Sequence, residues 1–309
     1  MIGKALIITP FFRPNIGGCE TFAEDFAKAL SAKYLVHVCT HTWTKPILWQ
    51  GLSFWKAFGM ARKLAGPAFS MNSKYEYDRV YALGLIASFV CCILNIRFYT
   101  VMLALYDFQP KHWWARWVLN RAEKVFVEGR AGEEDLIALG MKKDRIVRYQ
   151  HWCDQSRFHY VPRETTGNLK VLFVGRPIPI KGKHIIEACE KLTTGVDYEY
   201  IENVKYEDLP QYYQRADVLV VPSLYNEGFT RVVIEAASCG CIILASNRGA
   251  LPELVNPFGF YIDPTPGNFK RMLMKWSTSP RFIRLTQETT TMFAKNFFSA
   301  KNAEVFLCE

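Results

Sequence analysis

Short apolar runs alternate with amphipathic stretches along the whole chain. Helical patterns, the first of them at about 21–32, separate the apolar runs. Strands that alternate with helices in this way form parallel sheets with crossover helices. The pattern therefore predicts an α/β fold made of two such units in tandem. The predicted strands are 5–8, 35–40, 79–82, 98–105 and 124–127 in the first unit, and 170–175, 198–201, 217–221, 241–245 and 260–262 in the second.

A polar stretch at 162–168 interrupts the alternation and predicts a linker between the units. The length of 309 residues suits two domains, since one domain takes about 100–200 residues. The ligand of a parallel sheet lies at the carboxyl ends of its strands, and with two units the natural site is the cleft between them. We therefore expect functional residues directly after predicted strands.

The most apolar stretch of the chain, 80–96, has no charged residue. It is shorter than the roughly 20 residues that span a bilayer, and it contains Gly84. We expect a buried core helix here rather than a membrane-spanning one. The apolar run at the N-terminus is too short for a signal peptide.

The nine cysteines are irregularly spaced, and no Cys-x-x-Cys occurs among them. No zinc-type spacing links them to the six histidines. This usage favours the reducing cytosol over a disulfide framework. We therefore expect a cytoplasmic protein.

The loop after the first predicted strand contains Gly17 and Gly18 and leads into a helix. Glycines let the backbone approach a ligand closely, and the free N–H groups of a helix N-terminus bind anions. The same pattern is equally typical of a plain strand–helix turn, so this loop alone does not indicate a site.

The loop that opens the second unit carries Gly175, Arg176 and Lys181. Arg176 offers a planar fork of donors and Lys181 a point charge, and both groups suit a phosphate. The alternative is a pair of solvated surface cations. Because both flank a loop that follows a strand, we favour phosphate binding.

A third loop, after the strand that ends at Val221, carries Glu227 and leads into a helix predicted to start at Thr230 and to contain Glu235. Carboxylates accept hydrogen bonds from sugar and ribose hydroxyls, and a helix N-terminus suits a diphosphate. Glu227 is alternatively a helix-start charge. Glu235 has apolar neighbours, and its burial without a ligand would be costly. The loop therefore points to a sugar nucleotide.

These residues resemble the donor half of GT-B glycosyltransferases of family 4, which pair a Gly-Arg…Lys-Gly loop with a Glu-x7-Glu motif. The resemblance is strong over 170–262, moderate over 1–40 and 120–160, and poor over 41–110. The residues that carry it are Gly175-Arg176…Lys181-Gly182, Pro222-Ser223…Glu227-Gly228-Phe229…Glu235-Ala236, Cys239-Gly240, Ala245-Ser246, Gly249…Pro252-Glu253, Pro10…Gly17-Gly18…Glu20 and Arg145-Ile146-Val147…Asp154…Phe158.

The resemblance implies two Rossmann-like domains that face a central cleft: an acceptor-side domain over 1–162 and a donor nucleotide-sugar domain over 163–289. A C-terminal helix at about 290–309 would return to the first domain. It implies a retaining hexosyl transfer from a nucleotide-diphosphate sugar, of UDP or GDP type, with no cofactor and no metal. No Asp-x-Asp, the metal-chelating motif of the other large glycosyltransferase fold, occurs in the sequence.

The resemblance also implies a role for each motif residue. The catalytic residues are Arg176 and Lys181, which neutralise the departing diphosphate, and Glu227, which holds the transferred sugar. Glu235 would hold the ribose. The remaining donor-binding positions are Gly17, Gly18, Gly175, Gly228, Phe229 and Thr230.

Three positions depart from the family pattern. Thr230 stands where the family usually has glycine, which narrows the sugar pocket or changes its hydrogen bonding. The family often has an acceptor-side histidine near the end of the strand predicted at 98–105, where this chain offers Tyr106 or Asp107. The usual Asn-Gly before the interdomain Asp154 is replaced by His151-Trp152-Cys153.

Composition and charge indicate which kind of partner the protein binds. The chain is 50% apolar and 22% charged, which excludes disorder, collagen and coiled coil. Its net charge of +9 favours an anionic partner. Residues 1–160 carry 21 Lys and Arg against 13 Asp and Glu, a net charge of +8, and seven of the eight tryptophans lie before residue 153.

Two basic, aromatic stretches lie in this half. An amphipathic helix over 47–65 would present Leu48, Leu52, Trp55 and Phe58 on one face, and 111–121 would place Trp113 and Trp117 one turn apart. Such helices bind membrane interfaces, and anionic lipid attracts each nearby cation by about 1 kcal/mol. The alternatives are core aromatics beside a solvated basic face, or nucleic-acid binding by stacking. We favour membrane contact and consider nucleic acid unsupported by any motif.

The sequence as a whole predicts a cytoplasmic glycosyltransferase, peripheral on the inner face of a membrane, whose acceptor is a glycan or lipid held by the first domain. Two alternatives stay open. One is a GT-B-like sugar-nucleotide epimerase, and the other is a non-catalytic membrane- or nucleic-acid-binding protein with a degenerate donor site.

Overall fold

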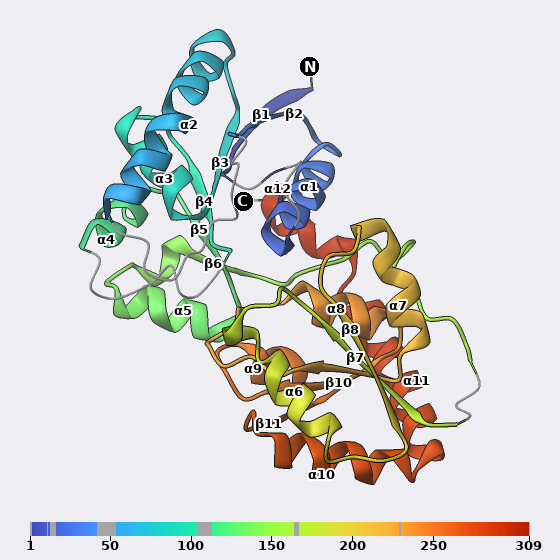
Figure 1. Cartoon of the computed structure of the whole chain (residues 1–309). Coiled ribbons are helices and arrows are strands. Elements are labelled where there is room, and N and C mark those ends of the chain that lie inside the picture. The colour runs from blue at the N-terminus through green and yellow to red at the C-terminus, as the bar shows by residue number, and fades with distance from the viewer. Residues whose placement is uncertain are drawn as a thin grey trace. The chain divides into compact units, whose positions relative to one another are not determined.

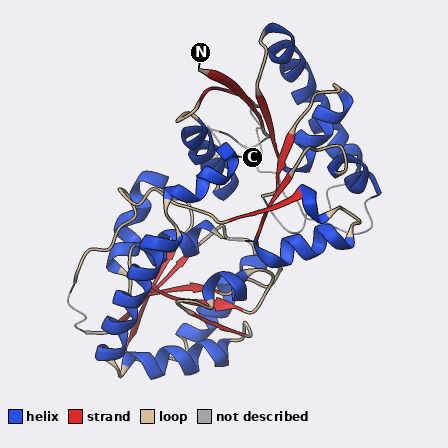
Figure 2. Ribbon diagram, turned by 180° about the vertical axis from the view of Figure 1, so that it is seen from behind, coloured by secondary structure: helices blue, strands red, loops and turns tan. Residues whose placement is uncertain are grey.

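The chain is divided into two compact units, and each has its own parallel β-sheet covered by helices (Figures 1 and 2). The computed structural model describes residues 2–10, 12, 17–41, 54–103, 113–163, 167–228 and 230–308, without the side chains of 54–57 and 113. Unit 1 comprises 1–150 and 302–309, and unit 2 comprises 151–301.

Unit 1 holds a six-stranded sheet in the order β2-β1-β3-β4-β5-β6, in which each neighbouring pair of strands is parallel. The strands are β1 (Gly3–Ile8), β2 (Tyr34–Cys39), β3 (Arg79–Leu83), β4 (Tyr99–Val101), β5 (Val125–Glu128) and β6 (Ile146–Tyr149). The helices are α1 (Gly18–Leu30), α2 (Phe54–Lys74), α3 (Gly84–Ile93), α4 (Trp113–Leu119), α5 (Gly129–Ala138), the 3-10 turn η2 (Lys143–Arg145) and α12 (Val305–Cys308).

Alternation along the strands of unit 1 builds a separate apolar layer on each face of its sheet. Leu6 and Val80 point into the layer under α2–α5, while Tyr81 and Phe126 face the side that carries α1 and α12 (Figure 1). On that second face, the ring of Phe306 lies between those of Phe26, Phe126 and Tyr149, at centroid distances of 4.8, 4.6 and 5.1 Å. The C-terminal segment therefore completes the core of unit 1.

Unit 2 holds a five-stranded parallel sheet in the order β11-β10-β9-β7-β8. The strands are β7 (Leu169–Val174), β8 (Val196–Ile201), β9 (Val218–Val221), β10 (Ile242–Ser246) and β11 (Phe260–Ile262). The helices are η3 (Pro179–Lys181), α6 (Lys183–Glu190), η4 (Tyr206–Asp208), α7 (Leu209–Arg215), α8 (Arg231–Ser238), α9 (Leu251–Val255), α10 (Pro266–Ser277), α11 (Pro280–Phe297) and η5 (Ala300–Glu304), whose last residues already belong to unit 1.

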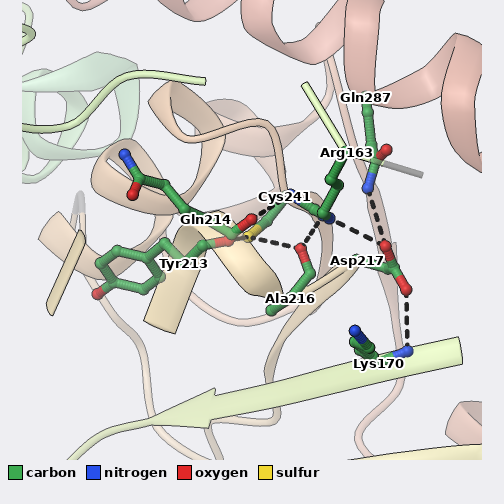
Figure 3. A network of polar contacts seen from close by, with 8 residues as sticks. All are labelled: Arg163, Lys170, Tyr213, Gln214, Ala216, Asp217, Cys241 and Gln287. Carbon is green, nitrogen blue, oxygen red and sulfur yellow. Dashed lines mark hydrogen bonds and ion pairs between the residues drawn. The ribbon is translucent and has the colours of Figure 1, made fainter. Parts of the chain in front are cut away.

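The division between the units lies at 150/151, earlier than the predicted 162/163, because the intervening segment packs on unit 2. The Cys153 thiol lies 3.3 Å from Ser238 Oγ, and Phe158 is fully buried against the ring of Tyr206. Arg163, at the start of the predicted linker, pairs with Asp217 at 3.2 Å (Figure 3).

The return to unit 1 also differs from the prediction. Helix α11 stays in unit 2, where Gln287 donates to Asp217 Oδ1 at 3.2 Å (Figure 3) and Thr290 donates to the carbonyl of Phe258 at 3.1 Å. Only the segment after Lys301 joins unit 1. A helix that begins at about 290 and ends in the first domain is therefore not what the structure shows.

The stretch 80–96 contains a buried helix, as predicted, but this helix is shorter than the stretch. The first part of this stretch is strand β3 and the remainder begins helix α3, with the change of direction at Gly84, whose φ is 80°. Within the residues that the structure describes, no helix is long and apolar enough to span a bilayer. The nine cysteines all lie in the described part of the chain outside any disulfide, and most of them are buried.

Candidate functional site

Three loops of unit 2 meet at the carboxyl ends of its strands: one after β7, one after β9 and one after β10. Leu224 N donates to the carbonyl of Ile180 and Ala250 N to that of Glu227, each at 2.8 Å, so backbone hydrogen bonds join the loops. Gly182 allows the loops after β7 and β9 to approach each other, since its φ is 75° and a Cβ there would lie 2.0 Å from the carbonyl oxygen of Pro222. The loops therefore form a single structure.

Lys181 and Glu227, predicted from separate motifs, form an ion pair in this structure. The ammonium of Lys181 lies 2.7 Å from Glu227 Oε1 and donates to the Tyr225 hydroxyl at 2.8 Å. Ser223 Oγ donates to Glu227 Oε1 at 2.5 Å and Tyr225 to Glu227 Oε2 at 2.6 Å. Glu227 is buried while the Lys181 side chain is partly exposed. We call these four residues the Lys181 cluster.

The loops after β7 and β9 also carry the other site residues that the sequence predicts there. Arg176 is exposed, directly after β7, and Gly175 donates its N–H to the carbonyl of Ile201 at 3.0 Å. Gly228 is half-buried, and Phe229 lies outside the described residues. Thr230 precedes the first residue of α8, and among the described atoms its buried hydroxyl has no hydrogen-bond partner.

Glu235 is buried on α8 and already has partners within the chain. Its Oε1 accepts from the Tyr206 hydroxyl at 3.2 Å and from Arg231 Nε at 3.3 Å, and its Oε2 accepts from the Tyr213 hydroxyl at 3.2 Å. Burial raises the pKa of the Glu235 carboxyl, against the lowering effect of Arg231 and the two phenols. Partners within the protein therefore offset the cost of burying Glu235, so its burial does not by itself indicate a ligand.

Arg231, Tyr206 and Tyr213 are residues that the sequence reasoning missed. Arg231 stands one helical turn before Glu235, and this spacing brings two charges together on a helix. That signal was available in the sequence. The two tyrosines come from η4 and α7, and only the fold brings them to Glu235.

The predicted site residues of unit 1 are only partly described. Gly17 is extended and precedes α1, and its carbonyl accepts from Thr21 Oγ1 at 3.0 Å. A Cβ at Gly17 would lie 2.5 Å from a carboxylate oxygen of Glu20, so this carboxylate lies close to the start of α1. Gly18 begins α1. Tyr106 and Asp107 lie outside the described residues.

The basic, aromatic stretches of unit 1 divide between core and surface. Helix α2 buries Met60, Ala61, Leu64 and Ala68 and exposes Phe58 and Phe69. Residues 47–53 of the predicted helix lie outside the described part of the chain, as do the side chains of 54–57.

On α4, Trp117 packs its ring against Phe89, with a centroid distance of 6.4 Å, and is 41% exposed. The guanidinium of Arg121 lies 4.3 Å from its ring centroid. The two stretches therefore bury aliphatic side chains in the core and expose aromatic and basic ones.

Comparison with known proteins agrees with this architecture. Residues 156–297 match the family described as Glycosyl transferases group 1. O-antigen chain mannosyltransferase B of Escherichia coli is 45% identical over 65 residues, which are 21% of this chain and 17% of that protein. The match thus spans about a sixth of that relative's length.

Two solved structures are similar to nearly the whole chain. Sucrose-phosphate synthase from Thermosynechococcus elongatus matches with a TM-score of 0.81 and 17% identity, over 99% of this chain and 97% of that one. Anabaena HepE, in its complex with UDP-glucose, matches with a TM-score of 0.74 and 18% identity, over 98% of each chain. The α/β GT-B fold with two parallel sheets, predicted from the sequence, is confirmed.

Proposed function

We propose that this chain, whose residues 156–297 match the Glycosyl transferases group 1 family, moves a hexose from a nucleotide-diphosphate sugar to an acceptor. The observation that carries the proposal is the Lys181 cluster. It lies at the carboxyl edge of a parallel sheet, within the matched segment, where the ligands of such sheets bind. There a partly exposed cation is held against a buried carboxylate.

The cation of the cluster suits the diphosphate of the donor. When the bond between the sugar and the diphosphate breaks, negative charge develops on the leaving phosphate oxygens. Lys181, with the exposed Arg176 from the same loop, would neutralise that charge, which is electrostatic stabilisation of a transition state. These two side chains supply the positive charge, so we propose that the reaction needs no metal.

Glu227 suits the transferred sugar because Ser223, Tyr225 and Lys181 hold its carboxylate in place. A carboxylate fixed in this way accepts hydrogen bonds from sugar hydroxyls without first losing side-chain freedom. The free N–H groups at the start of α8, next to Gly228 and Thr230, would bind the sugar-phosphate. On the resemblance of these motifs to family 4, we propose that the transfer is retaining.

The Glu235 carboxylate has one lone-pair site left for a ribose hydroxyl, in addition to the three that its protein partners use. A carboxylate has about four lone-pair sites. Tyr206 and Arg231 use two sites on Oε1, and Tyr213 uses one on Oε2. The remaining site on Oε2 would accept one ribose hydroxyl, and Arg231 would stay paired while the donor is bound.

The acceptor side of the proposal rests on unit 1. Residues 1–160 carry a net charge of +8, and Phe58, Phe69 and Trp117 are exposed aromatics on α2 and α4. We propose that this surface contacts an anionic membrane at its cytoplasmic face and that the acceptor is a glycan or lipid presented there. A UDP or GDP sugar is the proposed donor, since Anabaena HepE binds UDP-glucose in the same fold.

The test is an assay of sugar transfer. Radiolabelled UDP- and GDP-hexoses are incubated with the chain and with lipid extracts as acceptor, and both labelled product and free nucleotide are measured. We expect free nucleotide to appear together with labelled acceptor, and Lys181→Ala to abolish both. Lys191→Ala, which removes an exposed lysine at the end of α6, is the matched control. Conversion of the sugar without an acceptor would instead show an epimerase.

A further inference from the structure

The outward face of helix α11 carries large apolar side chains. Leu285 is 48% exposed and Met292 66% exposed, while the opposite face of the helix, including Ile283 and Ala294, is buried in unit 2. Lone exposed apolar residues are common on protein surfaces. These two are not alone, because they border hollows in the adjacent surface.

Two shallow hollows lie along the same side of α11, and Pro257 and Thr289 line both of them. Leu285 lines one hollow and Met292, Phe293 and Phe297 line the other. The floor is rigid, because the ring of Phe293 stacks on Phe258 at a centroid distance of 5.0 Å and lies 4.5 Å from that of Phe297. The two hollows therefore adjoin at Pro257 and Thr289 beside an exposed helix, with apolar and polar side chains along their edges.

The spacing along α11 is that of a helix that packs on another helix. Leu285, Thr289, Met292 and Asn296 follow one another at intervals of four, three and four residues, which form one narrow stripe. Glu288 and Lys295, both exposed, flank this stripe on one side and stand seven residues apart. Flanking charges of this kind decide the partner and the orientation of paired helices.

We propose that α11 of one copy of this chain packs antiparallel on α11 of a second copy. In this register Thr289 lies opposite Met292 of the partner subunit, and Leu285 lies opposite the partner's Asn296. Glu288 then faces the partner's Lys295, and the two-fold axis repeats this contact with the roles reversed. The surface is self-complementary, as an isologous interface must be.

The charges favour a second copy over an unrelated partner. The opposite charges at 288 and 295 lie on one flank of the stripe near its two ends, so an antiparallel two-fold pairing places each charge against its complement. In this register each pair of facing side chains joins an apolar residue, Leu285 or Met292, with a polar one, Asn296 or Thr289. We therefore expect a dimer that dissociates on dilution. The proposal does not depend on the donor site, because α11 contributes no residue to the Lys181 cluster.

The test is sedimentation equilibrium of the whole chain over a range of concentrations. We expect a monomer–dimer equilibrium in the wild type and loss of the dimer in Met292→Asp. Glu288→Lys and Lys295→Glu should each raise the dissociation constant about tenfold, because each creates two like-charge contacts. The double variant Glu288→Lys with Lys295→Glu should restore the wild-type value.

The matched control is Arg271→Glu, which reverses an exposed charge on α10, outside the stripe. It should leave the dissociation constant unchanged. The melting temperature of each variant at low concentration shows that the fold is intact. A wild type that remains monomeric at every concentration, or a double variant weaker than both single variants, would overturn the proposal.

Discussion

At the scale of single residues, the site of unit 2 depends on two buried carboxylates with different partners. Glu227 is held by a partly exposed lysine, and Glu235 by a buried arginine. The first arrangement leaves its cation accessible to a ligand, while the second is satisfied within the protein. Binding and stability therefore respond differently to loss of each carboxylate.

Replacement of Glu235 by alanine should destabilise the fold by about 3–5 kcal/mol, because it leaves the buried Arg231 guanidinium without its carboxylate. Urea unfolding followed by circular dichroism measures this free energy. The double variant Glu235→Ala with Arg231→Leu should recover most of the loss. Wild-type stability in the single variant would show that Arg231 and Glu235 are not coupled.

Glu235 should also give unfolding a specific pH dependence. Its folded-state pKa is raised above the usual 4.5 by burial, so the folded state binds the proton more tightly than the unfolded state. Its contribution to stability therefore falls as the pH rises from about 4.5 through the folded-state pKa.

Urea unfolding of the wild type and Glu235→Gln at several pH values measures this contribution. The free energy of unfolding of the wild type should fall relative to that of the variant over that range. A difference that rises with pH would mean that Arg231 lowers the pKa of Glu235 more than burial raises it.

At the scale of elements, the predicted strands overlap observed ones because most of them are apolar runs bounded by turn residues. Strand β6 was missed, since its four residues are short and include Arg148. The start of the helix within 80–96 was not predicted, because a strand and a helix that are both buried have the same apolar pattern, and the change of direction falls at Gly84.

The candidate site likewise contains residues that local sequence predicts and residues that only the fold brings together. Lys181 and Glu227 were identified from loop position and motif, and the structure places them in contact. Tyr206 and Tyr213 lie more than twenty residues before Glu235, and no local pattern marks them as its partners. Position after a strand therefore predicted which residues form the first carboxylate's site, but not how the second carboxylate is satisfied.

The loops should separate if Gly182 is given a side chain. Gly182→Ala would place a Cβ 2.0 Å from the Pro222 carbonyl at a φ of 75°, and would displace Lys181 from the cluster. Gly167→Ala is the matched control, since Gly167 has a φ of 81° but open space around it. Thermal melting should show a cost of about 1–2 kcal/mol in the control and a clearly larger one in Gly182→Ala. Equal costs would mean that the loop contact is dispensable.

At the scale of the whole molecule, the last residues belong to the first unit. Phe306 is buried among aromatic rings from α1, β5 and β6, and Tyr81 donates to its carbonyl at 2.5 Å. The C-terminal segment therefore stabilises a unit whose other residues precede 151.

Phe306→Ala should destabilise unit 1 by about 3–5 kcal/mol through loss of buried aromatic surface. Hydrogen exchange read by mass spectrometry should show faster exchange in α1 and β5 and unchanged exchange in β7 and β9. Phe297→Ala, which removes a 38% exposed phenylalanine from α11, is the control and should leave unit 1 unchanged. Equal acceleration in both units would contradict this assignment.

The central claim is that unit 2 binds a nucleotide-diphosphate donor through the Lys181 cluster. The most direct measurement is the thermal stability of the wild type, Lys181→Ala and Lys191→Ala with UDP, GDP, ADP and their sugars. One of these nucleotides, at 100 times its dissociation constant, should stabilise the wild type and Lys191→Ala by about 2.7 kcal/mol, and Lys181→Ala far less. A wild type that none of them stabilises, or a Lys181→Ala response equal to that of the wild type, would contradict the claim.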